Sequence, residues 1–368
     1  MGHDPELLTS PLHERHVALG AKFAEFGGWS MPLEYSGAVK EHTAVREAVG
    51  VFDVSHLGKA VVRGAGAAAY VNACLTNDLA KIEPGQAQYT LCCNDDGGVV
   101  DDLIQYLRSP DEVFLIPNAA NTAAVVHLLA ASAPRGIEVE NLHRDYAILA
   151  VQGTNSDDTL SAAGYPVGHD YMSFVELERD GAPVVVCRTG YTGERGYELV
   201  VPDAAALTTW DTIMTAGTAY GIVPAGLAAR DTLRTEMGYP LHGQDISPSI
   251  TPVQARLGWA VGWGKPSFWG ADAMRAEREA KPARVLRGLV AEERGIPRPH
   301  MGVSGVDGEA LGEVTSGTFS PTRRVGIGLA LLAASARDRD TVYVDVRGRR
   351  QPFTVTKPPF VTPGVHES

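Results

Sequence analysis

Apolar and polar positions alternate with two different periods between Lys59 and Leu142, and the two periods follow one another in a regular order. Alternation at every second residue predicts strands, whereas apolar residues spaced by three or four predict helices. We therefore expect helices at Ala65–Leu75 and Asn121–Ala131. The expected strands are Lys59–Arg63, Ala87–Cys93, Val99–Leu107, Val113–Ile116 and Ile137–Leu142. This order is close to a split β-α-β arrangement.

A comparable order of elements begins again at Ala147. We expect one helix from Thr154 and another that is capped by Asp203. The expected strands are Ala147–Gln152, Phe174–Glu178, Val184–Arg188 and Tyr197–Val201. The two halves therefore look like structural repeats. A further helix is expected at Pro224–Met237, with Gly238 as its C-cap.

A charged, alanine-rich stretch between Phe268 and Pro282 predicts a solvated helix, and the pattern changes after it. Short strand-like runs separated by Gly, Pro and Asp follow, and they predict a small antiparallel barrel. These runs are Val285–Val290, Val325–Leu332, Thr341–Val346 and Gln351–Val355. A chain of 368 residues is longer than a single core usually supports, so we expect two or three packed units with a boundary near Pro282.

The charge of the chain is unevenly distributed. The net charge of -12 disfavours nucleic acid as a partner, because binding phosphates requires a basic surface. From Lys281 onward, however, 13 Lys and Arg residues face 9 Asp and Glu residues. The C-terminal segment therefore differs electrostatically from the rest of the chain.

Neither a membrane nor a metal is expected as a partner. No apolar run approaches the roughly 20 residues of a membrane helix, and residues 1–10 lack the basic start and apolar stretch of a signal peptide, so we expect a cytoplasmic protein. The cysteines form no CxxC pair and lie near no His at metal-ligand spacing. Because Cys92 and Cys93 are neighbours in an apolar run, we interpret them as small buried hydrophobic residues rather than catalytic thiols.

A GxGxxA run at Gly64–Ala69 lies between an expected strand and an expected helix, as dinucleotide binding requires. A nicotinamide-binding unit would continue into a parallel strand that ends in an acid about 20 residues later. Here the chain runs through Asn77 and Pro84 into an expected hairpin instead. We therefore favour a glycine-assisted turn followed by a packed, alanine-rich helix.

Two acids interrupt the apolar strand that follows the Asp96-Gly-Gly turn. Because side chains alternate along a strand, Asp101 and Asp102 must face opposite ways, and Asp102 shares a face with Val100 and Ile104. Burying a carboxylate is costly unless it is hydrogen-bonded, so an inward acid needs a partner or a ligand. From the residues alone, a solvent-facing acid at either position is an equal alternative.

Three glycines in seven residues bracket Tyr191 in the segment from Arg188 to Glu198. Glycines spaced in this way let a loop approach a ligand closely, although a decorated hairpin turn has the same pattern. Glu198 falls within the strand that follows, and Arg230 falls within the expected helix before Gly238. Taken singly, each would be an ordinary surface charge.

Eight segments together resemble the aminomethyltransferase of the glycine cleavage system, the T-protein, over nearly the whole chain. The segments are Thr9-Ser-Pro-Leu-His, Gly27-Gly-Trp-Ser-Met-Pro-Leu-Glu-Tyr, Gly50-Val-Phe-Asp-Val-Ser-His-Leu-Gly, Tyr89-Thr, Gly97-Gly-Val-Val-Asp-Asp-Leu-Ile, Arg188-Thr-Gly-Tyr-Thr-Gly-Glu-Arg-Gly-Tyr-Glu, Gly226-Leu-Ala-Ala-Arg-Asp-Thr-Leu-Arg and Val314-Thr-Ser-Gly-Thr-Phe-Ser-Pro-Thr. Each segment alone is modest, but the ordered series is specific.

The resemblance implies an α+β, three-domain folate-binding fold with ferredoxin-like repeats and a C-terminal β-barrel. It divides the chain into a folate-binding region at 1–275, which includes a ferredoxin-like subdomain at 52–142, and a barrel at 284–368. It also implies the reaction. The family transfers the methylene of an aminomethyl group, carried on the lipoyl arm of H-protein, to tetrahydrofolate and releases ammonia. No metal is implied.

The resemblance also implies the residues of the site. The acid that handles the folate amine falls on Asp102, the second acid of the pair. The positions that contact folate fall on Leu57, Tyr89, Asn118, Tyr191, Glu198, Arg230 and Tyr239. Leu57 replaces the Met that is usual in the family after Ser-His, and the tail after Phe360 matches loosely, so no contact is carried over there.

Two other functions share this fold. One is a folate-dependent demethylase, and the other is a folate-binding accessory protein of iron-sulfur assembly, which is not a transferase. The complete series of motifs around Asp102 and Tyr191 favours the transferase. A further hypothesis is that acidic H-protein approaches the basic C-terminal segment, where the contributing residues are Arg323, Arg324, Arg347, Arg349 and Arg350.

Overall fold

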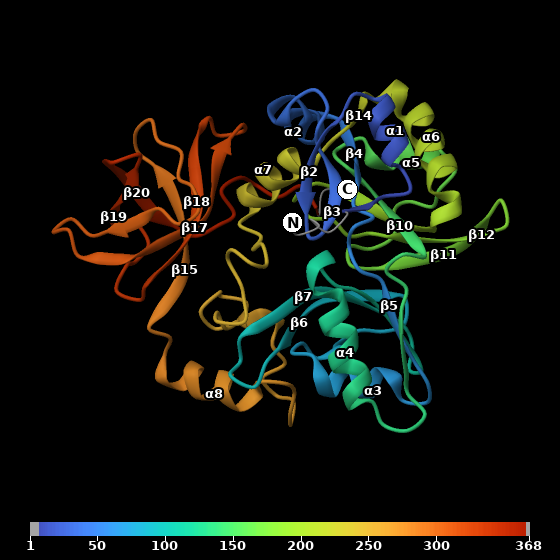
Figure 1. Ribbon diagram of the computed structural model, residues 1–368, viewed down its shortest axis with the longest axis horizontal. Coiled ribbons are helices and arrows are strands. Elements are labelled where there is room, and N and C mark those ends of the chain that lie inside the picture. The colour runs from blue at the N-terminus through green and yellow to red at the C-terminus, as the bar shows by residue number, and fades with distance from the viewer. Residues whose placement is uncertain (1–6, 366–368) are drawn as a thin grey trace, which may run out of the picture.

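The computed structural model describes residues 7–365, which form two stacked sheets and a separate barrel at one end (Figure 1). The first sheet has the strand order β6-β7-β8-β5-β9, and the helices α3 and α4 cover its outer face. Its elements are β5 (Ala60–Arg63), α3 (Ala67–Cys74), β6 (Gln86–Cys93), β7 (Val99–Ser109), β8 (Glu112–Ile116), α4 (Thr122–Ser132) and β9 (Glu138–Asn141). The predicted elements of this half are confirmed within a few residues.

The second sheet repeats this plan, with the order β11-β12-β13-β10-β4-β14. Its elements are β10 (Tyr146–Gln152), α5 (Ser156–Ala162), β11 (Phe174–Arg179), β12 (Ala182–Cys187), β13 (Gly196–Pro202), α6 (Ala206–Gly217) and β14 (Ile222–Pro224). The repeat is therefore confirmed, but an extra strand, β4 (Val49–Asp53), is inserted between β10 and β14.

Two predicted helix starts in this half were wrong. Asp203 begins a short 3-10 turn and caps nothing with its side chain, because α6 starts only at Ala206. Pro224 ends strand β14, so the next helix, α7 (Leu227–Met237), begins three residues later than predicted. Its predicted end is confirmed, since Gly238 adopts the left-handed conformation with φ of 69°.

The inner faces of the two sheets pack against each other. Phe114 of the first sheet and Val200 of the second belong to this shared core. The turn between β5 and α3 has Gly64 at φ 124°, where a Cβ would lie 2.0 Å from the Gly136 carbonyl oxygen. Because β5 pairs only antiparallel with its neighbours, the Gly64–Ala69 run makes a tight turn and not a dinucleotide-binding unit.

The N-terminal elements were not predicted from the pattern. They are β1 (Leu8–Thr9), α1 (His13–Ala18), β2 (Lys22–Phe26), β3 (Trp29–Glu34) and α2 (Ala38–Glu47). A buried polar cluster fixes them to β4, because Asp53 accepts hydrogen bonds from Ser10 and, at 2.8 Å, from His16 Nε2. The short β2–β3 ribbon extends to Ala119, which follows the first sheet's strand β8. A Cβ on Gly27, in the turn of this ribbon, would lie 3.0 Å from the Ala119 Cβ.

The C-terminal barrel is closed and has the order β15-β18-β17-β16-β19-β20. The strands are β15 (Arg284–Ala291), β16 (Gly302–Ser304), β17 (Ala310–Ser320), β18 (Val325–Ala333), β19 (Thr341–Val346) and β20 (Arg349–Thr356). Four of these were predicted. Strand β17 was missed because its polar and glycine residues hide the apolar alternation, and β16 because it has only three residues. The predicted charged helix is α8 (Ala271–Ala280).

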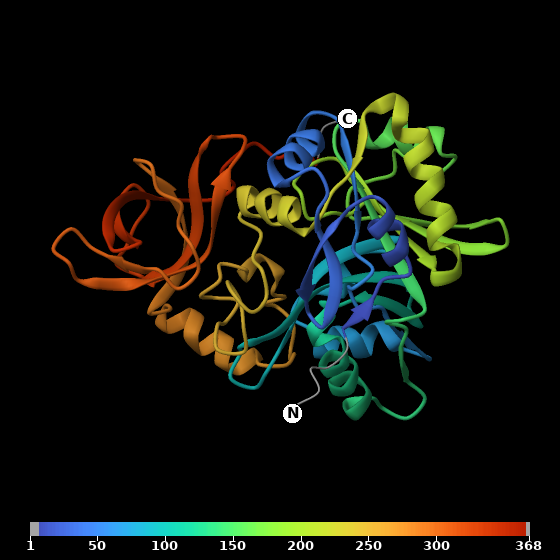
Figure 2. The same cartoon turned by 45° about the horizontal axis from the view of Figure 1, so that its top comes forward.

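Helix α7 lies between the barrel and the sheets (Figure 2). Arg234 of α7 forms a buried ion pair with Asp245 at 2.9 Å and donates to Ser316 of β17 at 2.9 Å, so a hydrogen bond joins the helix to the barrel. After β20 the chain returns to this junction, where the Phe360 amide donates to the Glu236 carbonyl. Further along, Gly364 N donates to Gly193 O and Arg188 donates to Val365 O. None of the helices within residues 7–365 is long and apolar enough to cross a bilayer.

Candidate functional site

All eight residues expected to form the site line one cavity of about 500 Å³ between the two sheets and the loop that follows α7. They come from segments that are far apart in the sequence. The residues are Leu57, Tyr89, Asp102, Asn118, Tyr191, Glu198, Arg230 and Tyr239. The fold therefore brings together all eight positions that the resemblance implies.

Asp102 lies on the wall of the cavity with both carboxylate oxygens hydrogen-bonded. Tyr89 OH donates to Oδ2 at 3.0 Å, and Asn118 Nδ2 donates to Oδ1 at 2.8 Å. Burial raises the pKa of Asp102, and these two donors oppose the rise. A raised pKa makes this carboxylate a stronger base than an ordinary aspartate, which suits a group that accepts a proton.

Asp101 does not line the cavity and is fully buried. The predicted divergence of the two acids is only partial, because Asn118 Nδ2 also donates to Asp101 Oδ1 at 2.9 Å. Asn121 Nδ2 donates to the same oxygen at 2.7 Å and lies 3.0 Å from His242 Nδ1. Burial and the neighbouring charge of Asp102 raise the pKa of Asp101 to about 8. The two acids therefore titrate as a linked pair.

Glu198 and Arg230 add two further charged groups to the cavity. Thr189 Oγ1 donates to Glu198 Oε2 from the neighbouring loop. The Arg230 guanidinium carbon lies 4.5 Å from the centre of the Tyr191 ring, and within residues 7–365 no hydrogen bond or ion pair reaches the Arg230 side chain. Burial lowers the pKa of Arg230, while the charge of Glu198 opposes this shift. An arginine with five unused donors in a cavity is suited to a ligand that presents oxygen atoms.

Aromatic side chains make the flat walls of the cavity. Tyr191 and Tyr239 lie with their ring centres 5.7 Å apart, and Tyr89 stacks on Trp259 at 5.2 Å. The Tyr191 hydroxyl donates to the Pro240 carbonyl, which fixes the ring. These surfaces match a flat conjugated ligand in shape.

The glycines around Tyr191 serve the packing of the protein itself. A Cβ on Gly190 would lie 2.1 Å from Gln152 Oε1, and one on Gly193, at φ 78°, would lie 2.0 Å from the Met237 sulfur. The loop therefore packs closely against Gln152 of β10 and Met237 of α7. The sequence predicted that these glycines allow a close approach, and the structure shows this approach to other parts of the protein.

Other residues of the cavity were not found from the sequence. They include Phe26, His56, His242 and Trp259. His56 precedes Leu57 in a recognised segment, but a lone histidine gives no signal of its own. The four cysteines are buried free thiols, which confirms the interpretation of Cys92 and Cys93 as buried residues. Among residues 7–365, no group of three or more His, Cys, Asp or Glu side chains could hold a metal ion.

Family comparisons match both parts of the chain. Residues 12–265 match the GCVT N-terminal domain, and residues 284–362 match the glycine cleavage T-protein C-terminal barrel domain. The aminomethyltransferase of Parafrankia sp. (strain EAN1pec) is 64% identical over 359 residues, covering 97% of this chain and 98% of the relative. That of Mycobacterium tuberculosis is 58% identical over 363 residues, covering 98% and 99%.

A solved structure agrees with these sequences. The crystal structure of glycine cleavage system aminomethyltransferase T from Bartonella henselae superposes with a TM-score of 0.92 at 33% identity, covering 97% of this chain and 99% of that one. The two domain matches, the near-complete relatives and the shared structure lead to one assignment: this chain belongs to the glycine cleavage T-protein family of aminomethyltransferases.

Proposed function

We propose that this chain transfers a methylene group from the aminomethyl-lipoyl arm of H-protein to tetrahydrofolate, at the cavity described above. The observation that carries the proposal is that the eight residues implied by the resemblance converge on one cavity. The direct test incubates the purified chain with aminomethyl-loaded H-protein and tetrahydrofolate. Methylene-tetrahydrofolate and ammonia should form together. Neither a demethylase nor an iron-sulfur accessory protein is favoured by any feature of the cavity.

The protein needs to supply little covalent chemistry for this reaction. The methylene lies between nitrogen and sulfur in the substrate and is already activated. Two folate nitrogens each lose a hydrogen as they bond to this carbon, and the hydrogens go to the departing amine and to the sulfur. The enzyme has to align the reactants and move these protons. We assign the proton transfer to Asp102, because its carboxylate is held by Tyr89 and Asn118 at the cavity wall.

The other residues would hold the folate. Glu198 accepts hydrogen bonds from the amino-pterin edge, while Arg230 donates to oxygen atoms of the ligand. Tyr191, Tyr239 and the Tyr89–Trp259 stack enclose the flat rings. Leu57 adds an apolar contact, and Asn118 positions Asp102.

Removing the two charged residues together should weaken folate binding. We expect Glu198→Ala with Arg230→Ala to raise the dissociation constant of tetrahydrofolate by about 10- to 100-fold, the range for losing buried charged hydrogen bonds. Calorimetric titration measures this directly. EDTA treatment of the wild-type chain should leave the affinity unchanged. An unaltered affinity in the double variant, or a loss after EDTA, contradicts this assignment of the site.

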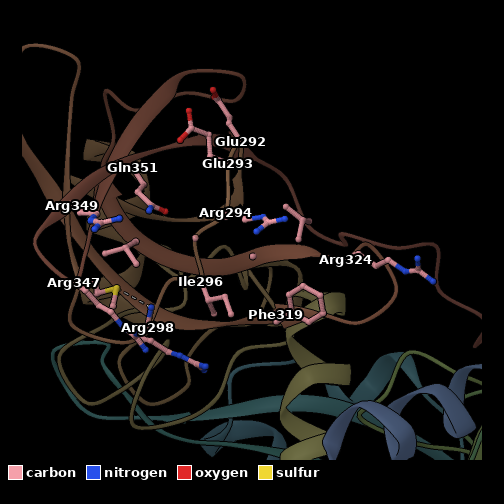
Figure 3. A pocket seen from close by; sticks show the side chains of 15 residues that line it. Glu292, Glu293, Arg294, Ile296, Arg298, Phe319, Arg324, Arg347, Arg349 and Gln351 are labelled. Atoms are coloured by element: carbon pink, nitrogen blue, oxygen red, sulfur yellow. Dashed lines mark hydrogen bonds between the residues drawn. The ribbon is translucent and has the colours of Figure 1, made fainter.

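The barrel carries a second hollow of about 1010 Å³, and five arginines and two glutamates are among the residues that line it (Figure 3). None of the eight predicted site residues lies there. The arginines are Arg294, Arg298, Arg324, Arg347 and Arg349. A local positive surface on a chain with a net charge of -12 suits an acidic partner, and we propose that acidic H-protein approaches here. Of the residues predicted from the sequence, Arg350 is less suitable, because it donates to the Gly305 and Val306 carbonyls.

This proposal predicts an association rate that depends on salt. The rate of complex formation with H-protein should fall as ionic strength rises, since steering between exposed charges is screened. Arg347→Glu with Arg349→Glu should slow association and flatten its salt dependence, while Lys22→Glu on β2, outside the barrel, should not. Stopped-flow mixing of chain and H-protein gives both rates. If the wild-type association rate does not depend on salt, the proposal that H-protein approaches the barrel is wrong.

We also propose that residues 1–275 and 284–368 act as the two working units of the chain, with 52–142 as a subdomain of the first. The first unit contains every residue of the proposed folate site. The second unit presents the basic hollow. A cytoplasmic location is proposed as well, because four unpaired thiols are typical of a reducing compartment.

A further inference from the structure

One buried histidine at the cavity lacks a hydrogen-bond partner. His56 lines the cavity and is only 1% exposed, yet its Nδ1 atom accepts or donates no hydrogen bond within residues 7–365. By contrast, both ring nitrogens of His16 are bonded, to Tyr35 and to Asp53. Leaving a buried polar atom unpaired costs about 1–3 kcal/mol, so such an atom needs an explanation.

The surroundings of His56 keep its ring uncharged. Burial, followed by the positive charge of Arg230, lowers the pKa of His56 to about 3, and Asp53 opposes this only in part. Lys59 and His143 also lower it. A neutral imidazole has one nitrogen that donates and one that accepts. His56 therefore offers a kind of hydrogen bond that Arg230, which only donates, cannot offer.

The position of the ring is fixed without help from its nitrogens. Its edge packs against Phe26, with ring centres 5.3 Å apart and an angle of 85° between the planes. The His56 carbonyl is 2.8 Å from His143 Nε2, which anchors the backbone. Phe26 and Leu57 line the same cavity. The imidazole is thus held in place by packing and by its backbone, and no hydrogen bond from residues 7–365 occupies Nδ1.

We propose that His56 contacts bound tetrahydrofolate, with a ring nitrogen hydrogen-bonded to the polar edge of the pterin beside the group that Arg230 holds. This inference rests on the proposed function and adds a residue to its site. The pterin edge presents both hydrogen-bond donors and acceptors, and so does a neutral imidazole. Binding of folate then supplies the partner that Nδ1 lacks in the free protein.

Three substitutions at this position test the inference. His56→Leu removes both nitrogens and keeps an apolar side chain, so tetrahydrofolate should bind about tenfold more weakly, as expected for one buried hydrogen bond. The thermal midpoint of the free protein should be unchanged or higher, because an unpaired polar atom has been removed. His56→Asn keeps a polar atom near the place of Nδ1 and His56→Gln keeps one near Nε2, and at least one of them should restore most of the affinity.

In steady-state kinetics, the loss of His56 should affect folate binding but not the transfer step. With loaded H-protein, His56→Leu should raise the KM for tetrahydrofolate by about tenfold and change kcat by less than about threefold, because Asp102 is untouched. His13→Leu is the matched control. His13 also has an unpartnered Nδ1 and packs on an aromatic ring, that of Phe23, but it does not line the cavity. Its replacement should leave folate affinity unchanged.

The outcomes distinguish this inference from the proposed function. If wild-type chain does not bind tetrahydrofolate, the proposed function fails. If wild type binds and His56→Leu binds equally well, only the role of His56 is overturned. If all three variants lower the thermal midpoint or fail to fold, His56 is a structural residue and the inference is likewise overturned. Weaker binding at an unchanged midpoint, with rescue by Asn or Gln, supports it.

Discussion

Replacing Asp102 by Asn should lower the rate of methylene transfer by about 10²- to 10⁴-fold, the usual loss when a general base is removed. Tetrahydrofolate should still bind, because Asn keeps the shape of the side chain and one oxygen that can accept from Tyr89 or Asn118. The substitution removes the negative charge and the proton-accepting capacity of the carboxylate. Single-turnover transfer and calorimetric folate affinity, measured on the same preparation, separate the two effects.

The dependence of the rate on pH gives a second signature. The base acts in its unprotonated form, and burial raises the pKa of Asp102, so the wild-type rate should increase as pH rises through this raised value. The increase should be absent in Asp102→Asn. Asp96→Asn in the exposed turn is the control and should behave as wild type. Asp101→Asn should act mainly through stability, by roughly 0.5–3 kcal/mol. If turnover is near normal in Asp102→Asn but is lost in a stably folded Asp101→Asn, the general base is Asp101 and not Asp102.

Replacing Glu236 by Ala should reduce the free energy of unfolding by about 3–5 kcal/mol, the cost of breaking a buried ion pair from one side. Glu236 on α7 is fully buried and accepts from Arg46 at 2.9 Å, from Ser320 at 2.5 Å and from Thr322 N at 3.1 Å. His42 Nε2 lies 3.2 Å from the same carboxylate. The substitution therefore leaves buried donors unpaired where α2, α7 and the barrel meet. Urea denaturation measures the loss.

Acid should weaken the same contact. Hydrogen bonds and the charges of His42 and Arg46 lower the pKa of Glu236 to about 2 against the opposing effect of burial. A depressed pKa means that the stabilisation is complete above the unfolded value of about 4.3 and is lost as pH falls through about 2. Glu236→Gln cannot titrate, so its stability difference from wild type should shrink over that window. Asp272→Ala, at a fully exposed position, should change stability by less than about 0.5 kcal/mol. A pH-independent difference contradicts the role of the charge.

The periodic parts of the fold could be predicted from the sequence because local pattern determines them. Strand β7 and helix α4 have clear apolar spacing, and both were found. The β2–β3 ribbon was missed although it is a local hairpin. Strand β4 was missed because pairing with β10, far along the chain, makes it a strand. Local pattern carries no information about such partners.

The residues that line the cavity were predictable in part, but their geometry was not. Asp102 and Glu198 were found through their segments, yet the shared amide of Asn118, which links the two acids, depends on how β8 ends beside β7. The role of the glycines near Tyr191 was also hidden, because Gln152 and Met237 come from other elements. The sequence shows which residues are unusual, whereas their neighbours are set by tertiary packing.

The return of the C-terminal tail to the Tyr191 loop has a consequence for biosynthesis. The loop is held by Gly364 through Gly193, and Arg188 at its start is held by Val365. A ribosome releases the N-terminal sheets first, and these can pack while the barrel is still being translated. The wall of the cavity that carries Tyr191 cannot gain these last bonds until residue 365 has been made. In a nascent chain, Asp101 and Asp102 can therefore reach their places before the loop that carries Tyr191 gains its last hydrogen bonds.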